Sequence, residues 1–438
     1  MKPKGLLVAL VLLAGFGGAA VWVYKHPADD SKKSTDGSNT KLLTIPDDQF
    51  QQIKIAKLTG ETIDLKKDNG RWRMVAPKEL PADQDTVGSM QSTLASLSSD
   101  KLIEPNATDL SGFGLNQPTL DVSIVRKDGK TDRILIGDDT PTGSGAYAKL
   151  PNDNRVFTVS STVKSTLDKR PDDLRDKRVM TFDSDKISRV ELTAKGQTVE
   201  FGKNAQNEWA IVKPRPLRAD GSAVDGLVSK LKDAKMDLTT TPDEAAKKFA
   251  GGTKVATAAV TDAGGTQTME VRRDQEKSVY VKSSAVDGIY KANVDLADGV
   301  DKSLDDFRNK KLFDFGFSDP SKVDVKGVSY TKDGDKWKAN GKNMDNTTVQ
   351  NLIDKLRDLA ATKFADKGEG APVFDASVTS NSGKRVEKVT ITKQGDQYFA
   401  QREGEPSIYV LDGKAVEDLQ KAAADVKEAP PETPAKKK

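Results

Sequence analysis

The amino-acid sequence predicts an α+β protein built from three tandem copies of one unit, in which a helix covers one face of an antiparallel sheet. Three observations predict this fold class. Tryptophans recur at positions 72, 209 and 337, at intervals of 137 and 128 residues. An amphipathic helix with the same apolar spacing follows each of them, and the segments that join the copies are alike. Self-similarity at a long period is the signature of a repeat protein.

Each of these tryptophans lies on the second strand of a predicted hairpin. In the first copy, apolar residues alternate with polar ones up to Asn69-Gly70, and the alternation resumes at Trp72. Asn-Gly is the strongest short-range hairpin signal. Residues 204–207 precede Trp209, and Asp333-Gly334 precedes Trp337, in the same way. Alternation with period two places each tryptophan on one face of its sheet, which we expect to be the core face.

A helix is predicted after each hairpin, starting at Asp83, Asp220 or Asp345, which is a favourable residue type for an N-cap. Each aspartate lies four residues before the first apolar position of the helix. The apolar positions have offsets of 0, +3, +7 and +10 in all three copies, which is one stripe of an amphipathic helix. They are Val87, Met90, Leu94 and Leu97, then Val224, Leu227, Leu231 and Ala234, then Val349, Leu352, Leu356 and Leu359.

More strands follow each predicted helix. The strand at 120–124 turns at Asp128-Gly129, and the later copies turn at Gly264-Gly265 and Ser382-Gly383. Each copy then ends with an aromatic strand and a short helix. The aromatic strands lie at 156–159, 289–292 and 408–411.

The junctions between copies also match, because residues 173–179 parallel residues 306–312. Each junction leads through an aromatic residue, Phe182 or Phe317, into the next copy, whereas the third copy has no such exit. We therefore divide the chain into six parts. They are an N-terminal transmembrane anchor (1–25), a disordered linker (26–41), repeat unit 1 (42–182), repeat unit 2 (183–315), repeat unit 3 (316–426) and a disordered tail (427–438).

Composition excludes several function classes. The 438 residues contain no cysteine and one histidine, His26, which precedes the predicted body. Disulfides, thiolate metal sites, a cysteine nucleophile and a histidine base in the body are therefore excluded. The 69 basic and 66 acidic residues are interspersed and nearly balance, at a net charge of +3. Such a surface does not indicate a nucleic-acid partner, since nucleic-acid binders cluster their basic residues.

The N-terminus predicts a membrane anchor. Lys2 and Lys4 precede an apolar run from Gly5 to Tyr24, whose length matches the hydrocarbon core of a bilayer. The alternative is a cleaved signal peptide, with Gly18-Ala19-Ala20 as the cleavage site. The apolar run continues past that site, which favours retention. We expect a single-pass protein of the bacterial inner membrane whose body lies in the periplasm or outside the cytoplasm.

The first copy carries a series of motifs in a characteristic order. Residues 113–118 read Phe-Gly-Leu-Asn-Gln-Pro, Ile136-Gly137 and Tyr147 follow, and then come the Val-Phe-Thr-Val strand at 156–159 and the Asp-Leu-Arg-Asp-Lys exit at 173–177. This order resembles the bacterial family catalogued as domain of unknown function 4340. The resemblance covers roughly residues 45–185. It weakens in the second copy, which lacks the Gly-Leu-x-x-Pro turn, and is thin in the third.

Members of that family are similar to this chain in having an N-terminal anchor and an exported body. Their genes often neighbour ABC-type export systems related to the gliding-motility transporter. The resemblance therefore implies an accessory role and a protein partner in such a transporter complex. The family has no assigned activity, cofactor or catalytic residues, so the resemblance implies no site residue.

Several local patterns invite a chemical interpretation, and each has a simpler structural one. The Asp-Gly and Asn-Gly pairs lack the ligand spacing of a calcium loop and predict hairpin turns. The glycine-rich stretch at 137–145 lacks the Gly-Lys-Ser/Thr of a phosphate loop and leads into a strand, which predicts an ordinary loop. The pairs Asp172-Asp173 and Asp305-Asp306 suggest a glycosidase, but acidic pairs are expected by chance among 66 acids.

Two further sets of residues are candidates for binding. Arg175 and Lys177, with Arg308 and Lys310, are able to bind an anion, but their place in the junctions favours pairing with carboxylates between repeats. The three body tryptophans are able to stack on glycans, but their shared position in a hairpin favours the core. We expect no catalytic, metal or cofactor-binding residues. The expected function is a non-enzymatic scaffold of a cell-envelope ABC-type export system, with an envelope ligand- or glycan-binding module as the alternative and a hydrolase as a third.

Overall fold

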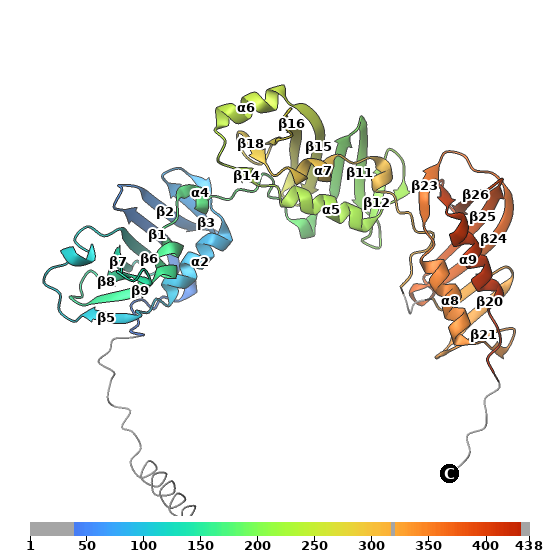
Figure 1. The fold of residues 1–438 in the computed structure, drawn as a ribbon, viewed down its shortest axis with the longest axis horizontal. Coiled ribbons are helices and arrows are strands. Elements are labelled where there is room, and N and C mark those ends of the chain that lie inside the picture. The colour runs from blue at the N-terminus through green and yellow to red at the C-terminus, as the bar shows by residue number, and fades with distance from the viewer. Residues whose placement is uncertain (1–38, 317–319, 431–438) are drawn as a thin grey trace, which may run out of the picture. The chain divides into compact units, whose positions relative to one another are not determined.

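The computed structural model of the chain describes residues 39–316 and 320–430 and has the α+β architecture that the sequence predicts (Figure 1). Within these residues the chain forms three sheets, each of nine antiparallel strands with the same order of strands. The chain divides between Lys177 and Arg178 into two compact units. The first unit holds repeat 1, and the second holds repeats 2 and 3.

Repeat 1 contains one sheet and the helices that cover it. Its strands are β1 (Phe50–Lys57), β2 (Thr62–Asp68), β3 (Arg71–Ala76), β4 (Leu80–Pro81), β5 (Lys101–Glu104), β6 (Leu120–Arg126), β7 (Thr131–Asp139), β8 (Gly145–Lys149) and β9 (Val156–Ser160). Its helices are α2 (Gln84–Ala95), α3 (Ser161–Leu167) and α4 (Pro171–Leu174), with short 3-10 turns η1 (Asp47–Gln49) and η2 (Ser111–Phe113).

Repeat 2 repeats this plan and adds one helix, α6, between the first long helix and the second set of strands. Its strands are β10 (Arg189–Ala194), β11 (Gln197–Lys203), β12 (Trp209–Lys213), β13 (Leu217–Arg218), β14 (Met236–Asp237), β15 (Thr253–Asp262), β16 (Gly265–Arg273), β17 (Val279–Ser283) and β18 (Ile289–Ala292). Its helices are α5 (Gly221–Lys232), α6 (Pro242–Gly251) and α7 (Asp295–Val300), with 3-10 turns η3 (Ser184–Lys186) and η4 (Leu304–Asp306).

Repeat 3 has the longest final helix, and α8 and α9 lie side by side in Figure 1. Its strands are β19 (Lys322–Val325), β20 (Val328–Asp333), β21 (Lys336–Ala339), β22 (Lys342–Asn343), β23 (Ala361–Ala365), β24 (Ala371–Ser380), β25 (Arg385–Gln394), β26 (Gln397–Arg402) and β27 (Ile408–Leu411). Its helices are α8 (Asn346–Arg357) and α9 (Gly413–Ala424), with the 3-10 turn η5 (Asn381–Gly383). The helix predicted as short is therefore long in this repeat.

The first long helix of each repeat connects the two edge strands of its sheet. In repeat 1, β4 and β5 lie at opposite ends of the strand order, and α2 joins them. Asp83, Asp220 and Asp345 cap α2, α5 and α8, because each carboxylate accepts a hydrogen bond from a backbone N–H in the first turn. All twelve apolar stripe residues are buried, as predicted. The last member of each stripe lies beyond the end of its helix.

The hairpins that carry the tryptophans form as predicted. Asn69 and Gly70 both have positive φ values, of 48° and 81°, which the tight turn between β2 and β3 requires. Trp72 and Trp337 are buried in their own cores, with 4% and 5% of their surface exposed. Trp209 differs because it is only partly buried and packs at the margin of its core.

Two short extended segments, one at each end, complete every repeat. The entry segment pairs with the chain just after the long helix, through Lys41–Ser98, Arg178–Lys235 and Lys311–Ala360. The exit segment pairs with the strand just before that helix, through Ala82–Arg175, Ala219–Arg308 and Met344–Glu428. The backbone N–H of each N-cap aspartate also donates to a carbonyl of the exit segment, at Leu174, Phe307 and Lys427. Backbone hydrogen bonds therefore define each repeat as residues 39–176, 178–309 or 310–429.

These bounds correct the predicted boundaries at 182 and 315. Val179 and Met180 lie in the core of repeat 2, and Leu312 and Phe313 lie in the core of repeat 3. The entry segments therefore belong to the repeats that they lead into. Their apolar side chains fill the following core, which the resemblance between the junctions did not reveal. Phe317 lies outside the described residues.

The ends of the body also extend further than the sequence predicts. The predicted linker runs to residue 41, but the N–H of Asn39 donates to the carbonyl of Ser99, and Leu42 is buried. The predicted tail starts at residue 427, but the N–H of Ala429 donates to the carbonyl of Asn343. Repeat 3 therefore has an exit segment after all. Its sequence differs from that of the two junctions, and the backbone bridge between Met344 and Glu428 and the hydrogen bond from Asp345 to Lys427 recur all the same.

The predicted membrane anchor at residues 1–25 lies outside the described residues, as do residues 26–38 of the linker and 431–438 of the tail. Among the described residues, no helix combines the length and the apolar character that crossing a membrane requires.

Candidate functional site

The candidate site is the junction between repeats 2 and 3, where charged side chains from distant parts of the sequence meet. Arg308, Glu387 and Ser407 are all buried there, with 8%, 5% and 5% of their surface exposed. Burying a charge is unfavourable unless the charge is paired and hydrogen-bonded. The partners of these groups therefore show what the junction does.

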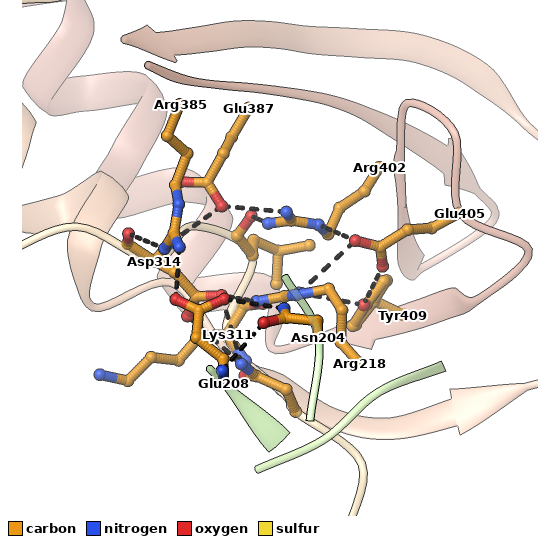
Figure 2. Close-up of polar contacts among 12 residues, drawn as sticks. Asn204, Glu208, Arg218, Lys311, Asp314, Arg385, Glu387, Arg402, Glu405 and Tyr409 are labelled. Carbon is orange, nitrogen blue, oxygen red and sulfur yellow. Dashed lines mark hydrogen bonds and ion pairs between the residues drawn. The ribbon is translucent and has the colours of Figure 1, made fainter. Parts of the chain in front are cut away.

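Arg218 is the centre of this cluster. It lies at the end of β13 in repeat 2, and its guanidinium points into repeat 3 (Figure 2). Nη1 donates to the carbonyl oxygen of Lys311 at 2.8 Å and to the hydroxyl of Tyr409 at 3.3 Å, and Nη2 donates to the carboxylate of Asp314. Nε lies 3.6 Å from Oε1 of Glu405. One side chain of repeat 2 thus contacts three segments of repeat 3, namely its entry segment, the loop between β26 and β27, and β27 itself.

Arg402 and Glu387 form a second, more deeply buried pair inside repeat 3. Nη2 of Arg402 donates to Oε1 of Glu387 at 2.9 Å, and its Nε donates to Oε1 of Glu405 at 2.6 Å. Its Nη1 donates to the carbonyl oxygen of Leu312. Glu387 also accepts a hydrogen bond from the backbone N–H of Asp314 at 2.9 Å. These two side chains hold the entry segment of repeat 3 against its own sheet.

Arg385 closes the cluster at the surface. Its Nη2 donates to Oε1 of Glu208 in repeat 2 at 2.5 Å, and its Nη1 donates to the carbonyl oxygen of Asp314 at 3.0 Å. Figure 2 shows these contacts as one connected set of dashed lines from Glu208 to Glu405. We call this set the junction network and define it as Glu208, Arg218, Asp314, Arg385, Glu387, Arg402, Glu405 and Tyr409.

The pKa values within the junction network follow from this pairing. Burial raises the pKa of Asp314, but Arg218, Asn309 and Arg402 together outweigh burial and leave the pKa below its usual value. Burial lowers the pKa of Arg218, but the charges of Asp314, Tyr409 and Glu405 raise it overall. Burial, with the charge of Glu405, raises the pKa of Tyr409 to about 12. The network therefore keeps Asp314 ionised and Tyr409 neutral at physiological pH.

A groove opens beside the junction network. It has a volume of about 510 Å³, and its walls come from both repeats. Repeat 2 contributes Trp209 and Arg218, and repeat 3 contributes Arg385, Glu405 and Ser407. The indole Nε1 of Trp209 donates to Oδ1 of Asp225 at 2.7 Å, which fixes the orientation of the ring.

Arg308, one of the predicted anion-binding residues, supports the junction instead. Its Nη1 donates to Oδ1 of Asp305 at 3.1 Å, and its Nη2 donates to Oγ of Ser407 in repeat 3 at 3.0 Å. Its guanidinium also lies 3.4 Å from the ring centroid of Phe364, which is close enough for a cation–π contact. Arg308 therefore connects the two repeats, but through Ser407 and Phe364, and the predicted carboxylate pair between repeats is wrong for this residue, because its carboxylate partner is Asp305 of the same repeat. Lys310 contributes its backbone carbonyl, which accepts from Ala361.

The remaining predicted residues have structural roles. Asp173 accepts from the backbone N–H of Arg170 and Asp306 from that of Ser303, so one residue of each acidic pair caps a helical turn. The predicted Asn-Gly and Asp-Gly pairs form hairpin turns, in which Gly70, Gly129 and Gly334 have positive φ values. Within the described residues, no group of three or more potential metal-ligating side chains is found.

In the structure, residues of the motif in repeat 1 that resembles the family pack against one another. A Cβ atom at Gly137 would lie 2.2 Å from the carbonyl oxygen of Phe113, so only glycine fits there. The rings of Phe113 and Tyr147 pack edge to face, with their centroids 5.0 Å apart. Of the glycine-rich stretch predicted as a loop at 137–145, residues 140–144 form the connection, whereas 137–139 belong to β7 and Gly145 begins β8.

Comparison with known families identifies the family to which the chain belongs. The family model described as Domain of unknown function (DUF4340) matches residues 72–211 and again residues 209–376. The two matches cover more than half of the chain, and the protein therefore belongs to this family. They begin at Trp72 and Trp209, one repeat apart, and the second match extends into repeat 3. No curated protein and no solved structure matched the chain.

Sequence reasoning did not find the junction network. Its members come from the turn before β12, from β13, from the entry segment of repeat 3 and from the segment that runs from β25 to β27, and no short motif contains them. A signal was nevertheless present in the sequence. Aligning the repeats by their long helices sets Arg218 against Pro81 and Asn343, so an arginine without a counterpart marks one of the positions of repeat 2 that contact repeat 3.

Proposed function

We propose that this protein is a non-enzymatic accessory or scaffold protein of a cell-envelope ABC-type export system. In this proposal an N-terminal anchor holds it in the inner membrane, and its three repeats lie outside the cytoplasm. The transporter context comes from the family resemblance. The scaffold role rests on one observation, which is that the junction network pairs its buried charges with one another and joins two repeats.

The chemistry of the junction network favours a structural role over catalysis. A general acid at neutral pH needs a carboxyl group with a raised pKa. Every carboxyl group of the described residues whose pKa shifts has it lowered, and Asp314 and Glu208 in the network follow this pattern. Repeat arrays, by contrast, present extended surfaces to long partners. Fixing repeats 2 and 3 together would keep such a surface continuous.

Affinity capture tests this proposal. The full chain would be tagged at its C-terminus, cross-linked in cells, solubilised from membranes and captured, and the bound proteins would be identified by mass spectrometry. We expect an ABC-type permease or ATPase to be enriched. Capture of a variant that carries Arg402→Ala should lose that partner, whereas Lys388→Ala, on the same sheet, should keep it. Enrichment of no transporter subunit contradicts the proposal.

The non-enzymatic part has its own test. Single substitutions of each Asp, Glu and Lys to Ala would be screened for function in cells and then checked for folding and membrane fractionation. We expect every inactive variant to be misfolded or mislocalised. One well-folded, correctly located and inactive variant would revive the hydrolase interpretation.

A further inference from the structure

We propose that the groove between repeats 2 and 3 binds a neutral saccharide, with Trp209 as its stacking surface and the junction network as its hydrogen-bonding wall. This inference is independent of the proposed transporter role. It rests on the juxtaposition of a partly exposed indole ring with paired carboxylates and guanidiniums in one groove. Four observations support it.

The first observation is that Trp209 differs from its counterparts. Trp72 and Trp337 are buried in the cores of their repeats, whereas Trp209 is partly exposed and lines the groove. Its Nε1 bonds to Asp225, and Nζ of Lys203 lies 5.0 Å from its ring centroid. The ring is therefore held in place from β11 and α5 while part of its surface stays accessible. A fixed aromatic ring offers apolar area at little entropic loss, which suits the C–H face of a sugar.

The second observation is the charge of the groove. Glu208, Asp314 and Glu405 line it together with Arg218 and Arg385, and these groups are paired with one another. An anion would meet three carboxylates, and a cation would meet two guanidiniums. Hydroxyl groups both donate and accept, so a polyol can bond to both members of an ion pair without separating them. Such charge-assisted hydrogen bonds are stronger than neutral ones.

The third observation is that the strand beside the groove has no free edge. β13 pairs with β12 on one side, and on the other side Ala219 bridges to Arg308 and the N–H of Asn309 donates to the carbonyl of Arg218. An extended peptide usually binds by adding a strand to an exposed edge. This groove does not offer one at β13, which favours a saccharide over a peptide.

The fourth observation is that the groove is the right size and is preorganised. Its volume of about 510 Å³ lies within the range of small-ligand sites. The junction network holds both walls before any ligand arrives, because the contacts of Arg218 and Arg385 cross from one repeat to the other. Preorganisation reduces the entropy lost on binding.

Isothermal titration calorimetry of the full chain tests this inference. The chain would be purified in a zwitterionic detergent that contains no sugar, since a glycoside detergent would compete. The neutral probes are maltotriose and N,N′,N″-triacetylchitotriose, each up to about 10 mM, so that a site with a Kd of about 1 mM would approach saturation. Inorganic phosphate and tetralysine are the anionic and cationic comparison probes. We expect saturable binding of at least one trisaccharide and none of phosphate or tetralysine.

Two matched variants locate the binding to the groove. Gly221 lines the groove at the first position of α5, and a Cβ atom added there meets nothing within 4 Å. Gly221→Gln should therefore fill the groove without straining the fold and weaken binding at least about tenfold. Gly226→Gln, in the same helix, also enters open space but lies outside this groove, so it should leave binding unchanged.

A third variant tests the stacking surface. Trp209→Ala should weaken trisaccharide binding about tenfold, and Trp209→Phe, which keeps an aromatic ring, should lose less. If Trp209→Ala does not fold, Gly221→Gln still tests whether the trisaccharide binds in the groove. The inference is overturned by any of three results: neither trisaccharide binds, Gly221→Gln binds as well as the unmodified chain, or phosphate or tetralysine binds in preference to both sugars.

Discussion

The second junction and its counterpart in the first share a backbone plan but differ in their side chains. The N–H of Asn309 donates to the carbonyl of Arg218, and the N–H of Asp176 donates in the same way to the carbonyl of Pro81. The N–H of Asp314 donates to Glu387, and the N–H of Thr181 donates to Gln267 at 2.8 Å. Arg218, Asp314 and Glu387 of the second junction thus correspond, in that order, to residues of the first that carry no charge, which are Pro81, Thr181 and Gln267.

This difference separates two functions of a junction. Backbone hydrogen bonds complete each repeat and need no particular side chain, so they recur in all three copies. The ion pairs across the second junction, by contrast, depend on specific residues of repeats 2 and 3, which fall in one compact unit. We infer that these few side chains hold repeats 2 and 3 together, and the following variants test that inference.

The largest effect should come from Arg402→Ala. This change leaves Glu387, whose side chain is 4% exposed, as an unpaired buried charge. Breaking a buried pair by removing one partner typically costs about 3–5 kcal/mol. Hydrogen exchange measured by mass spectrometry over β25 to β27 should show opening that is easier by that amount. Lys388→Ala breaks an exposed pair with Glu403 and serves as the control, with an expected change below about 1 kcal/mol.

The alkaline stability of repeat 3 should depend on Tyr409. Its pKa is raised to about 12 in the folded chain, compared with about 10 for an unperturbed tyrosine. The folded state therefore holds the proton more tightly, so this contribution is complete below about pH 10 and is lost as the pH rises through 12. A shift of this size corresponds to at most about 3 kcal/mol.

The variant Tyr409→Phe isolates that effect. Its counterpart in repeat 1 is already Phe157, which pairs with Ala148 as Tyr409 pairs with Ala400. Between pH 10 and 12, the unmodified chain should lose more stability against urea than Tyr409→Phe does. Parallel pH profiles for the two proteins would contradict the assigned cause.

Exchanging residues between the junctions should have an intermediate effect. The double variant Asp314→Thr and Glu387→Gln gives the second junction the uncharged residues of the first. The backbone contact at residue 314 should persist, because glutamine accepts a hydrogen bond as it does at Gln267. Arg218 and Arg402 lose charged partners, which typically costs about 1–3 kcal/mol. Limited proteolysis between residues 309 and 320 should become faster, and an unchanged rate would show that side-chain charge does not hold the repeats together.

The smallest effect should come from Glu208→Gln at the surface end of the network. Glu208 is half exposed, so its pair with Arg385 should contribute no more than about 1 kcal/mol. The Arg385 hydrogen bond lowers the pKa of Glu208, so this contribution is present at neutral pH and is lost as the pH falls below about 4. Salt screens exposed pairs, and the difference between Glu208→Gln and the unmodified chain should vanish in 1 M NaCl. A difference that survives high salt would place this pair in the buried part of the network.

Much of each repeat was predictable because its signals are local. The N-cap aspartates, the twelve stripe residues and the Asn69-Gly70 turn each act within a few residues of chain, and all form as predicted. The first strand of repeat 1 at Phe50–Lys57, the edge strand after each long helix and α6 were not predicted. The edge strands are short, so their apolar alternation is too brief to stand out. The helix α6 occurs only in repeat 2, so the repeat comparison had no counterpart for it.

The sequence by itself determined the repeated backbone plan, since capping, turn formation and amphipathic spacing depend on neighbouring residues. Only the tertiary structure decided which charges meet, because Arg218 and Tyr409 are 191 residues apart and neither belongs to a local pattern. It also decided which of three equivalent tryptophans is exposed. Trp209 contacts its own repeat, but the other wall of the groove that it lines comes from repeat 3. No periodicity within one repeat encodes that wall.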